Sequence, residues 1–537
     1  MSTAKMEVPG MMPPPTQPRF LPRRAVALAS CAALSLCFGG MAHAQMAESV
    51  AGESLSPPGP KPRVWIEPRV SVGVTLSDNG TLSGSQSQAE QVIEVTPGVR
   101  GILNTPRVRG YFDYALSGRT HLQNSSRNKL RHALDASATV NAWDNRAFVD
   151  VSGSVADESI SAFDAPGGSV SRLNQSQTAS FRVSPYVQGT LGSAADYELR
   201  YSLQTVNSES ASRPDLTAQD ASARLVNGGS VGSLGWSFDA RTQSIEYEGG
   251  RDTRSDSVMA GLIYHATPQL VLTGLMGREA NDILTLSRES YNTAGVNLDW
   301  RPSPRTRLSA GVQERYFGRG HNVSLQHSTG RTVWRYTDRR GVVNNGLEAS
   351  AAPLGSLRNL LDSSFQTSFP DAIERNAEVD KVLAGLGLSG DLLVFQTYLT
   401  SAATLERSQQ LSVVLLGARG AVTLALSRSD ASRLDAPLAG APALPDDFDT
   451  NTRIQRDGWS LGYAHRLTPQ TSAQVSITGT RSQGTVDDSR STTVAVGLTS
   501  NLAPRTTARV QLRHTQHDGS VRDYGETAVV AVITHRF

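Results

Sequence analysis

Five arginines lie at spacings that could bind anions. Arg305, Arg307 and Arg315 lie in one segment of alternating polarity, and Arg509 and Arg513 lie in another, all on the polar face. If that face lines a lumen, the guanidinium groups would form a cationic ladder suited to anionic sugars or lipopolysaccharide-like groups. The same arginines could instead pair with Asp and Glu side chains on the inner surface. Both interpretations stay open at this stage.

A second candidate is an acidic loop, "LPDDFDTNT", which contains Asp446, Asp447 and Asp449. Oxygen-rich loops bind Ca²⁺ when their geometry allows it, but the spacing here is not that of an EF-hand. The pattern therefore favours a solvated acidic loop.

Motifs for other chemistry are missing from the sequence. It contains no P-loop, no dinucleotide-binding glycine motif after a buried strand, no H-E-x-x-H and no nucleophile elbow. The ten histidines have no zinc-site spacing. We expect no catalytic residue, no metal site and no cofactor, and so no enzyme; an outer-membrane hydrolase is the least favoured alternative.

Alternating polarity indicates the elements that must hold these residues. In "VWIEPRVSVGVTL", Val70, Val72 and Val74 share one face, and Arg69, Ser71 and Gly73 share the other. The pattern recurs almost to the end of the chain and predicts a transmembrane antiparallel up-and-down β-barrel. The expected strands, about 22 in number, cover 63–77, 90–104, 106–121, 129–142, 145–156, 175–190, 193–207, 217–231, 234–248, 253–266, 269–281, 288–301, 305–317, 320–328, 331–339, 397–415, 418–429, 453–467, 470–482, 489–502, 505–518 and 523–537.

Connections between these segments alternate in length. Those after even-numbered strands are short, and Pro268, Pro304, Pro469 and Pro504 lie in them. Those after odd-numbered strands are mostly longer and polar, which is the arrangement of bacterial outer-membrane barrels. An even strand count places both termini on the short-turn, periplasmic side. A soluble secreted β protein is the alternative, but it would leave the apolar faces exposed to water.

The last segment, "VVAVITHRF", has an apolar face made of Val529, Ala531, Ile533 and Phe537. It resembles the C-terminal signal that outer-membrane barrels present to their insertion machinery. His535 departs from that pattern, because an apolar or aromatic residue is usual at its position.

One long segment breaks the alternation. Residues 340–396 contain "FPDAIERNAEVDKVLAGLGLSG", in which Ile373, Ala377, Val379 and Leu383 form part of a helical apolar stripe. This helical insert could plug the lumen, cap its mouth, pack in the periplasm if the strand count is shifted by one, or form a surface loop with one helix.

The N-terminal residues have the features of export signals. Residues 1–44 end in an apolar run with an Ala42-His43-Ala44 site, which predicts an N-terminal extension and signal peptide cleaved before Gln45. A lipoprotein cleavage box at Cys31 is a weaker alternative. Residues 45–62 read as a flexible periplasmic lead, and the barrel as 63–537.

Four segments resemble a known family: "VGVTLSDNG", "RYFGRGHNVSLQHSTGRTVWRYTD", "FPDAIERNAEVDKVLAGLGL" with "FQTYLTSAATLERSQ", and "LLGARGAVTLALSRSD". They are similar to the outer-membrane β-barrel family associated with the PEP-CTERM/exosortase system. The resemblance covers essentially all of the mature chain. It implies association with exopolysaccharide production and protein sorting, and it transfers no functional residues.

Two functions are carried forward from these observations: an export or assembly conduit for polysaccharide, and a structural scaffold with a filled lumen. We expect as partners outer-membrane lipid and lipopolysaccharide, the insertion machinery, and exopolysaccharide or its export proteins. We expect no nucleic acid, because the formal net charge of the chain is only +2.

Overall fold

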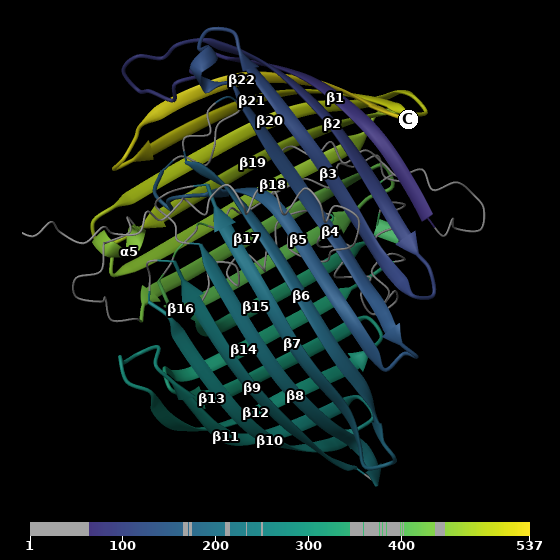
Figure 1. Cartoon of the computed structure of the whole chain (residues 1–537). Helices are drawn as coiled ribbons and strands as arrows, with labels where there is room; N and C mark the ends of the chain where they lie inside the picture. The colour runs from purple at the N-terminus through teal and green to yellow at the C-terminus, as the bar shows by residue number, and fades with distance from the viewer. Residues whose placement is uncertain are drawn as a thin grey trace, which may run out of the picture. The chain divides into compact units, whose positions relative to one another are not determined.

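The computed structural model of the chain describes residues 64–164, 170, 174–209, 215–231, 233–248, 251–343, 358, 375, 378–379, 383, 398, 400, 402–434 and 446–537 (Figure 1). The predicted cleavage site at Ala42, Ala44 and Gln45, the lead 45–62 and most of the insert 340–396 lie outside this set. The insert begins later than expected, because a strand continues to Val343.

Strands form nearly everywhere that the sequence alternates between polar and apolar residues. Their bounds are β1 (Val64–Ser77), β2 (Glu90–Asn104), β3 (Val108–His121), β4 (Lys129–Trp143), β5 (Ala147–Ser159), β6 (Gln175–Leu191), β7 (Ala195–Ser208), β8 (Leu216–Val231), β9 (Leu234–Tyr247), β10 (Thr253–Thr267), β11 (Leu270–Asn281), β12 (Glu289–Ser303), β13 (Thr306–Arg315), β14 (Gly318–Ser328), β15 (Thr332–Val343), β16 (Thr404–Leu416), β17 (Gly420–Arg433), β18 (Arg453–Arg466), β19 (Thr471–Gln483), β20 (Asp488–Ala503), β21 (Thr506–Gly519) and β22 (Tyr524–Arg536). Among the elements whose bounds are described, two are short and helical, η1 (Ser125–Arg127) and α5 (Asp447–Thr450).

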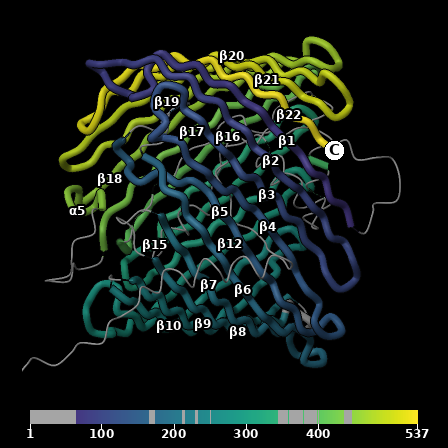
Figure 2. Tube along the Cα trace, turned by 45° about the horizontal axis from the view of Figure 1, so that its top comes forward, coloured from purple at the N-terminus to yellow at the C-terminus, as the bar shows by residue number. Residues whose placement is uncertain are grey.

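The 22 strands form one antiparallel sheet that closes on itself. Each strand pairs with the next along the chain, and β1 pairs with β22 from Arg69 opposite Arg536 to Ser77 opposite Ala528. Figures 1 and 2 show purple β1 beside yellow β22. Closure leaves no open edge, so every strand has two hydrogen-bonding neighbours. The predicted fold class, an all-β up-and-down barrel of 22 strands, is confirmed.

The two ends of the barrel differ in their connections. The short-turn end holds the tight turns after even-numbered strands, including those of Pro268, Pro304, Pro469 and Pro504. The first residues of β1 and the last residues of β22 lie at the same end. The long-loop end holds the connections after odd-numbered strands. One of these, between β13 and β14, is a tight turn rather than a long loop.

The outer face of the barrel is apolar between its two ends. Because β-strand side chains alternate between the faces, one register places a continuous apolar belt on the outside. Exposed members of this apolar belt are Val72, Val74, Val95, Phe181, Leu199, Phe238, Leu262, Met276, Val296, Val312, Leu424, Leu461, Val496, Val510, Leu512 and Ile533. A belt of this kind is stable against hydrocarbon and would aggregate in water, so the barrel spans a membrane in the manner of outer-membrane proteins.

Within the described residues, no helix is long and apolar enough to cross a membrane.

The C-terminal strand contributes its predicted face to this belt. Val529, Ile533 and Phe537 are exposed on the outside, and the Phe537 backbone N–H donates to the carbonyl of Pro68 at 3.0 Å. His535, the residue that departs from the usual pattern, shares a hydrogen bond with the Thr506 hydroxyl at 3.0 Å. Its ring also meets Phe537 edge-on, with ring centroids 4.9 Å apart. The role of this face as an insertion signal stays a prediction.

Candidate functional site: the polar inner wall of the barrel

The inner faces of β1, β2 and β3 carry a group of paired charges. The Arg69 guanidinium donates twice to the Asp113 carboxylate, at 3.0 and 2.5 Å. Arg100 approaches the same carboxylate, with its Nε 3.3 Å from Oδ2. Arg100 and Asp113 are direct partners in the β2–β3 register. A single carboxylate on β3 therefore neutralises guanidinium groups from two other strands.

Arg69 reaches Asp113 because the strand between them carries a glycine. Arg69 lies opposite Gly98 in the β1–β2 register. A Cβ at Gly98 would lie 3.1 Å from the Arg69 Nε and 2.9 Å from the Tyr114 carbonyl oxygen. The missing side chain leaves a path across β2 along which the arginine extends.

The wall continues onto β4 with an acid that has a different kind of partner. The Tyr111 hydroxyl donates to both oxygens of Asp135, at 3.0 and 3.1 Å. In the part of the chain that the structure describes, Asp135 forms no ion pair. This carboxylate keeps spare acceptor capacity toward the lumen.

A second group of charges surrounds Arg200 on β7. Its guanidinium donates to Asp150 at 2.8 Å and to Glu198 at 2.9 Å. It also lies over the Tyr186 ring, with 3.9 Å between Cζ and the ring centroid. The Thr139 hydroxyl donates to Asp150 at 2.7 Å. Arg200 is thus contacted by side chains of β5, β6 and β7, and Thr139 on β4 supports one of its partners, which fixes its position on the wall.

The predicted cationic arginines fall on two distant strands. Arg305 is exposed in the turn before β13, and Arg307 lies on the inner face of β13 with its Nη2 3.9 Å from Asp299. Arg315 pairs with buried Glu279 at 2.7 Å. These residues are eight strands away from β21, which carries the other two.

On β21, the inner-face arginines also have partners. Arg513 lies 3.6 Å from buried Glu526, and Arg509 donates to the Gln511 side chain at 3.2 Å. These contacts agree with the second interpretation given above, in which the arginines pair with side chains of the inner surface. The use of the five arginines as a ligand ladder stays a prediction.

Sequence reasoning did not select the charges on β1–β7. The available signal was the polar half of each alternating segment, where Glu67 and Arg69 lie two residues apart, as do Glu198 and Arg200. Which acid would meet which arginine depends on cross-strand register, and the chain positions alone do not give it.

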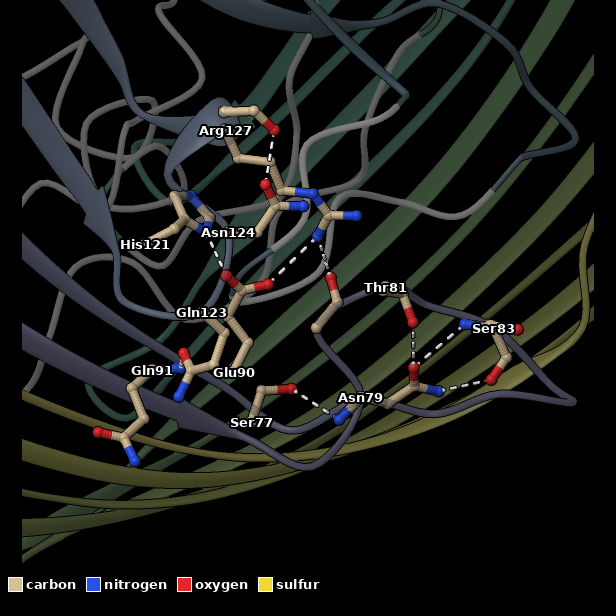
Figure 3. Close-up of polar contacts among 12 residues, drawn as sticks. Ser77, Asn79, Thr81, Ser83, Glu90, Gln91, His121, Gln123, Asn124 and Arg127 are labelled. Atoms are coloured by element: carbon tan, nitrogen blue, oxygen red, sulfur yellow. Dashed lines mark hydrogen bonds and ion pairs between the residues drawn. The ribbon is translucent and has the colours of Figure 1, made fainter.

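The long-loop end of β1–β4 is organised by a buried polar cluster (Figure 3). Glu90 bonds to the His121 Nδ1 at 3.0 Å and to Arg127 at 3.3 Å. The Asn79 side chain donates to the Ser83 and Gly525 carbonyls at 2.8 and 2.9 Å. These contacts tie the β1–β2 and β3–β4 loops to the rim and act as structural supports.

The acidic loop is engaged by the protein's own donors. Asp446 caps α5 and accepts from the Thr400 hydroxyl at 2.9 Å. Asp447 accepts from the Ala162 N–H at 2.6 Å, and Asp449 pairs with Arg433 at 3.0 Å. Phe448 between them is buried against neighbouring loop residues and against Ala431 of β17 and Ile454 of β18. The three aspartates therefore position a loop.

A few residues of the predicted insert are described. Arg375, Glu378, Val379 and Leu383 are helical, and all but Glu378 are buried. Their spacing at four-residue steps puts Arg375, Val379 and Leu383 on one helix face. That face is covered by protein.

Comparisons with known proteins give the fold alone. No family model and no curated protein matches the chain. Among solved structures, it is similar to the siderophore receptor PirA from Pseudomonas aeruginosa, with 9% identity, a TM-score of 0.41, and coverage of 88% of this chain and 80% of that one. The FrpB iron transporter from Neisseria meningitidis has 9% identity, a TM-score of 0.46, and coverage of 88% and 82%. The copper transporter OprC has 9% identity, a TM-score of 0.39, and coverage of 89% and 82%.

Proposed function

We propose that this outer-membrane barrel is a conduit for a polar, hydroxyl-rich polymer of the exopolysaccharide class. The observation that carries the proposal is the inner wall of β1–β7, where arginines and carboxylates are paired with one another beside hydroxyl and amide groups. Arg69, Arg100 and Arg200 share this wall with Asp113, Asp135, Asp150 and Glu198.

Such a wall suits a neutral polymer with many hydroxyl groups. A sugar hydroxyl both donates and accepts, so it can bond with the free edge of a guanidinium and with the spare lone pairs of a carboxylate. Because the fixed charges cancel closely, the wall would not trap the polymer by net charge. Weak contacts at many sites allow entry and also release.

The resemblance to the barrel family of the PEP-CTERM system supports the same substrate class. It also supports exopolysaccharide export proteins as partners. The periplasmic location of both termini belongs to this proposal, as does recognition of Phe537 by the insertion machinery. We assign no catalytic step to the barrel.

A scaffold with a filled lumen is the second candidate. The specific observation in its favour is the burial of three described residues of this segment, Arg375, Val379 and Leu383. A barrel of 22 strands is wide, so its lumen would have to be filled by protein if it does not conduct.

The test is the conductance of the purified mature chain in a planar bilayer, beside a variant lacking residues 345–392. Steady openings of the intact chain are expected for the conduit. Openings that occur only after the deletion would make the insert a plug, and silence in both would favour the scaffold.

A second arm tests the polymer. A neutral glucan added to open channels is expected to block them transiently. The Arg69→Gln/Asp113→Asn double variant, which leaves the net charge unchanged, should shorten the blocks. The matched Arg453→Gln/Asp430→Asn variant removes an ion pair from the outer face and should leave them unchanged. Glucan without effect on open channels would contradict the polymer class.

A further inference from the structure

Charged residues follow the apolar belt on the outer face of β15–β20, toward the long-loop end. We call the following set of direct cross-strand neighbours, which includes the neutral Gln409, the outer charged row: Asp338, Gln409, Arg428, Asp457, Arg481 and Arg490. Arg428 in this row pairs with Asp457 at 3.3 Å. Arginine is thus neutralised by the protein in one part of the row.

Arg481 and Arg490 at the end of the row are different. They lie directly opposite each other on β19 and β20, and both are exposed. Among the described residues, neither forms a hydrogen bond or an ion pair through its side chain. Their neighbours in register are Asp457, which is bound to Arg428, and Asp518, which accepts from Gln516 at 2.9 Å. Like charges directly opposite each other destabilise a sheet unless a counter-charge lies between them.

The same face contains a matched case in which the protein supplies that counter-charge. Arg340 and Arg407 are also direct cross-strand partners. There, Asp338 accepts from the Arg407 Nη2 at 2.7 Å and from its Nε at 3.1 Å, and Arg340 donates to the Arg319 carbonyl. Among the described residues, the Arg481–Arg490 pair forms no such ion pair, since Asp457 contacts Arg428 and Asp518 accepts from Gln516, and the two exposed guanidinium groups are open to a counter-ion from outside the chain.

The position of the pair indicates which anions can reach it. Ile477 and Val494 face lipid on the same two strands, and Trp459 lies opposite Gly479. A Cβ at Gly479 would lie 2.4 Å from the Trp459 Nε1, so the indole covers this glycine. Tryptophan on a barrel surface marks the membrane interface. Arg481 follows Gly479 by two residues, about 7 Å along the strand toward the long-loop end.

We propose that Arg481 and Arg490 bind the phosphate of an anionic lipid headgroup in the leaflet on the long-loop side, which in an outer membrane is the phosphorylated lipid A of lipopolysaccharide. Two planar guanidinium groups can hold one phosphate through parallel charge-assisted hydrogen bonds. The phosphate relieves the repulsion between them, so binding and barrel stability are coupled. The proposal requires the barrel to lie in a membrane and is independent of what passes through it.

The test uses the purified full chain in neutral detergent, with bis-phosphorylated lipid A as the probe. The temperature at which the folded barrel converts to the slower-migrating unfolded form on a gel reports stability. Lipid A is expected to raise this temperature for the wild type and much less for Arg481→Gln/Arg490→Gln. The control Arg254→Gln/Arg453→Gln removes two outward arginines that have carboxylate partners, Asp256 and Asp430, and it should respond like the wild type.

Two comparisons distinguish the source of the phosphate. Dephosphorylated lipid A and inorganic phosphate should each leave the wild-type temperature unchanged. Equal protection of wild type and the Arg481→Gln/Arg490→Gln variant would overturn the proposal, as would equal protection by dephosphorylated lipid A or by inorganic phosphate. If the glutamine variant does not fold, Arg481→Lys/Arg490→Lys replaces it. This variant keeps the charge but cannot donate two parallel hydrogen bonds from each side chain, so it should respond more weakly than the wild type.

Discussion

Asp113 is the residue on which the charges of β1 and β2 depend. It accepts two hydrogen bonds from Arg69 and lies 3.3 Å from Arg100, and it is only partly exposed. Removing it deprives both guanidinium groups of the carboxylate that they contact. The arrangement makes Asp113 more costly to replace than other acids of the same wall.

We expect Asp113→Ala to lower the free energy of unfolding by about 1–3 kcal/mol, since partly buried charged groups lose their partner. Asp135→Asn is the matched control; it keeps an acceptor for Tyr111 and should cost less. Urea unfolding in lipid vesicles, followed by tryptophan fluorescence, measures both. Equal loss in the two variants would contradict a special role for Asp113.

The pairing of inner-face arginines with Asp and Glu was predicted only as one of two alternatives, the other being a cationic ladder for ligands. The sequence shows that Arg315 and Arg513 lie on polar faces. It does not show that Glu279 and Glu526 stand within reach, since 36 residues separate Arg315 from Glu279. That distance is bridged only when β11, β12 and β13 are in register.

At the scale of the strand, glycines determine where a long side chain can extend across a neighbouring strand. Gly98 opens the path of Arg69, and Gly479 accommodates the indole of Trp459. In both places the glycine on one strand is required by a long side chain on its neighbour. This is a reason for the small residues in alternating segments that otherwise favour bulky ones.

We expect Gly98→Ala to destabilise the barrel by about 1–3 kcal/mol, because the new methyl group overlaps the Tyr114 carbonyl and displaces Arg69. Gly274→Ala is the control, since nothing lies within 4 Å of a Cβ built there. Its unfolding free energy should equal that of the wild type or slightly exceed it. The same urea titration compares them, and a neutral Gly98→Ala would show that Arg69 reaches Asp113 by another path.

Most strand positions were predicted within a few residues, because period-two polarity persists wherever one face meets lipid and the other water. The start of the predicted strand 397–415 was wrong, because β16 begins only at Thr404. The predicted strand 331–339 ends too early, because β15 continues to Val343. Hydrogen bonds to β16 extend the strand, with Val343 opposite Thr404. No local polarity pattern reports a partner that lies about 60 residues later in the chain.

At the scale of the whole molecule, the seam between β1 and β22 makes the sheet a barrel. Val72 lies opposite Ile533 across this seam, and the Ser77 hydroxyl donates to buried Glu526 at 2.8 Å. Contacts of this kind join residues more than 440 positions apart. They protect the edges that would otherwise pair with other chains.

A disulfide should form across the seam in a Val72→Cys/Ile533→Cys variant of the chain that begins at Gln45, which contains no other cysteine. Direct cross-strand neighbours have Cβ atoms about 4.5–5.5 Å apart, which is close to disulfide geometry. The cross-linked chain should migrate differently from the reduced one on a denaturing gel. Val72→Cys/Val312→Cys, which joins β1 to distant β13, should give no cross-link, and equal yields in the two variants would contradict closure.

The sequence by itself determined the all-β class, the strand number, the alternation of short and long connections, and the apolar face of the last strand. These follow from local polarity, because the side chains of each strand face lipid and lumen in alternation. Only the tertiary structure decided that Arg69 and Arg100 share Asp113, that the three aspartates of the acidic loop bind the protein itself, and that Arg481 and Arg490 stand side by side and form no ion pair with any described residue. Such pairs depend on register and closure, which sum weak contacts over the entire sheet and have no signature in any single segment.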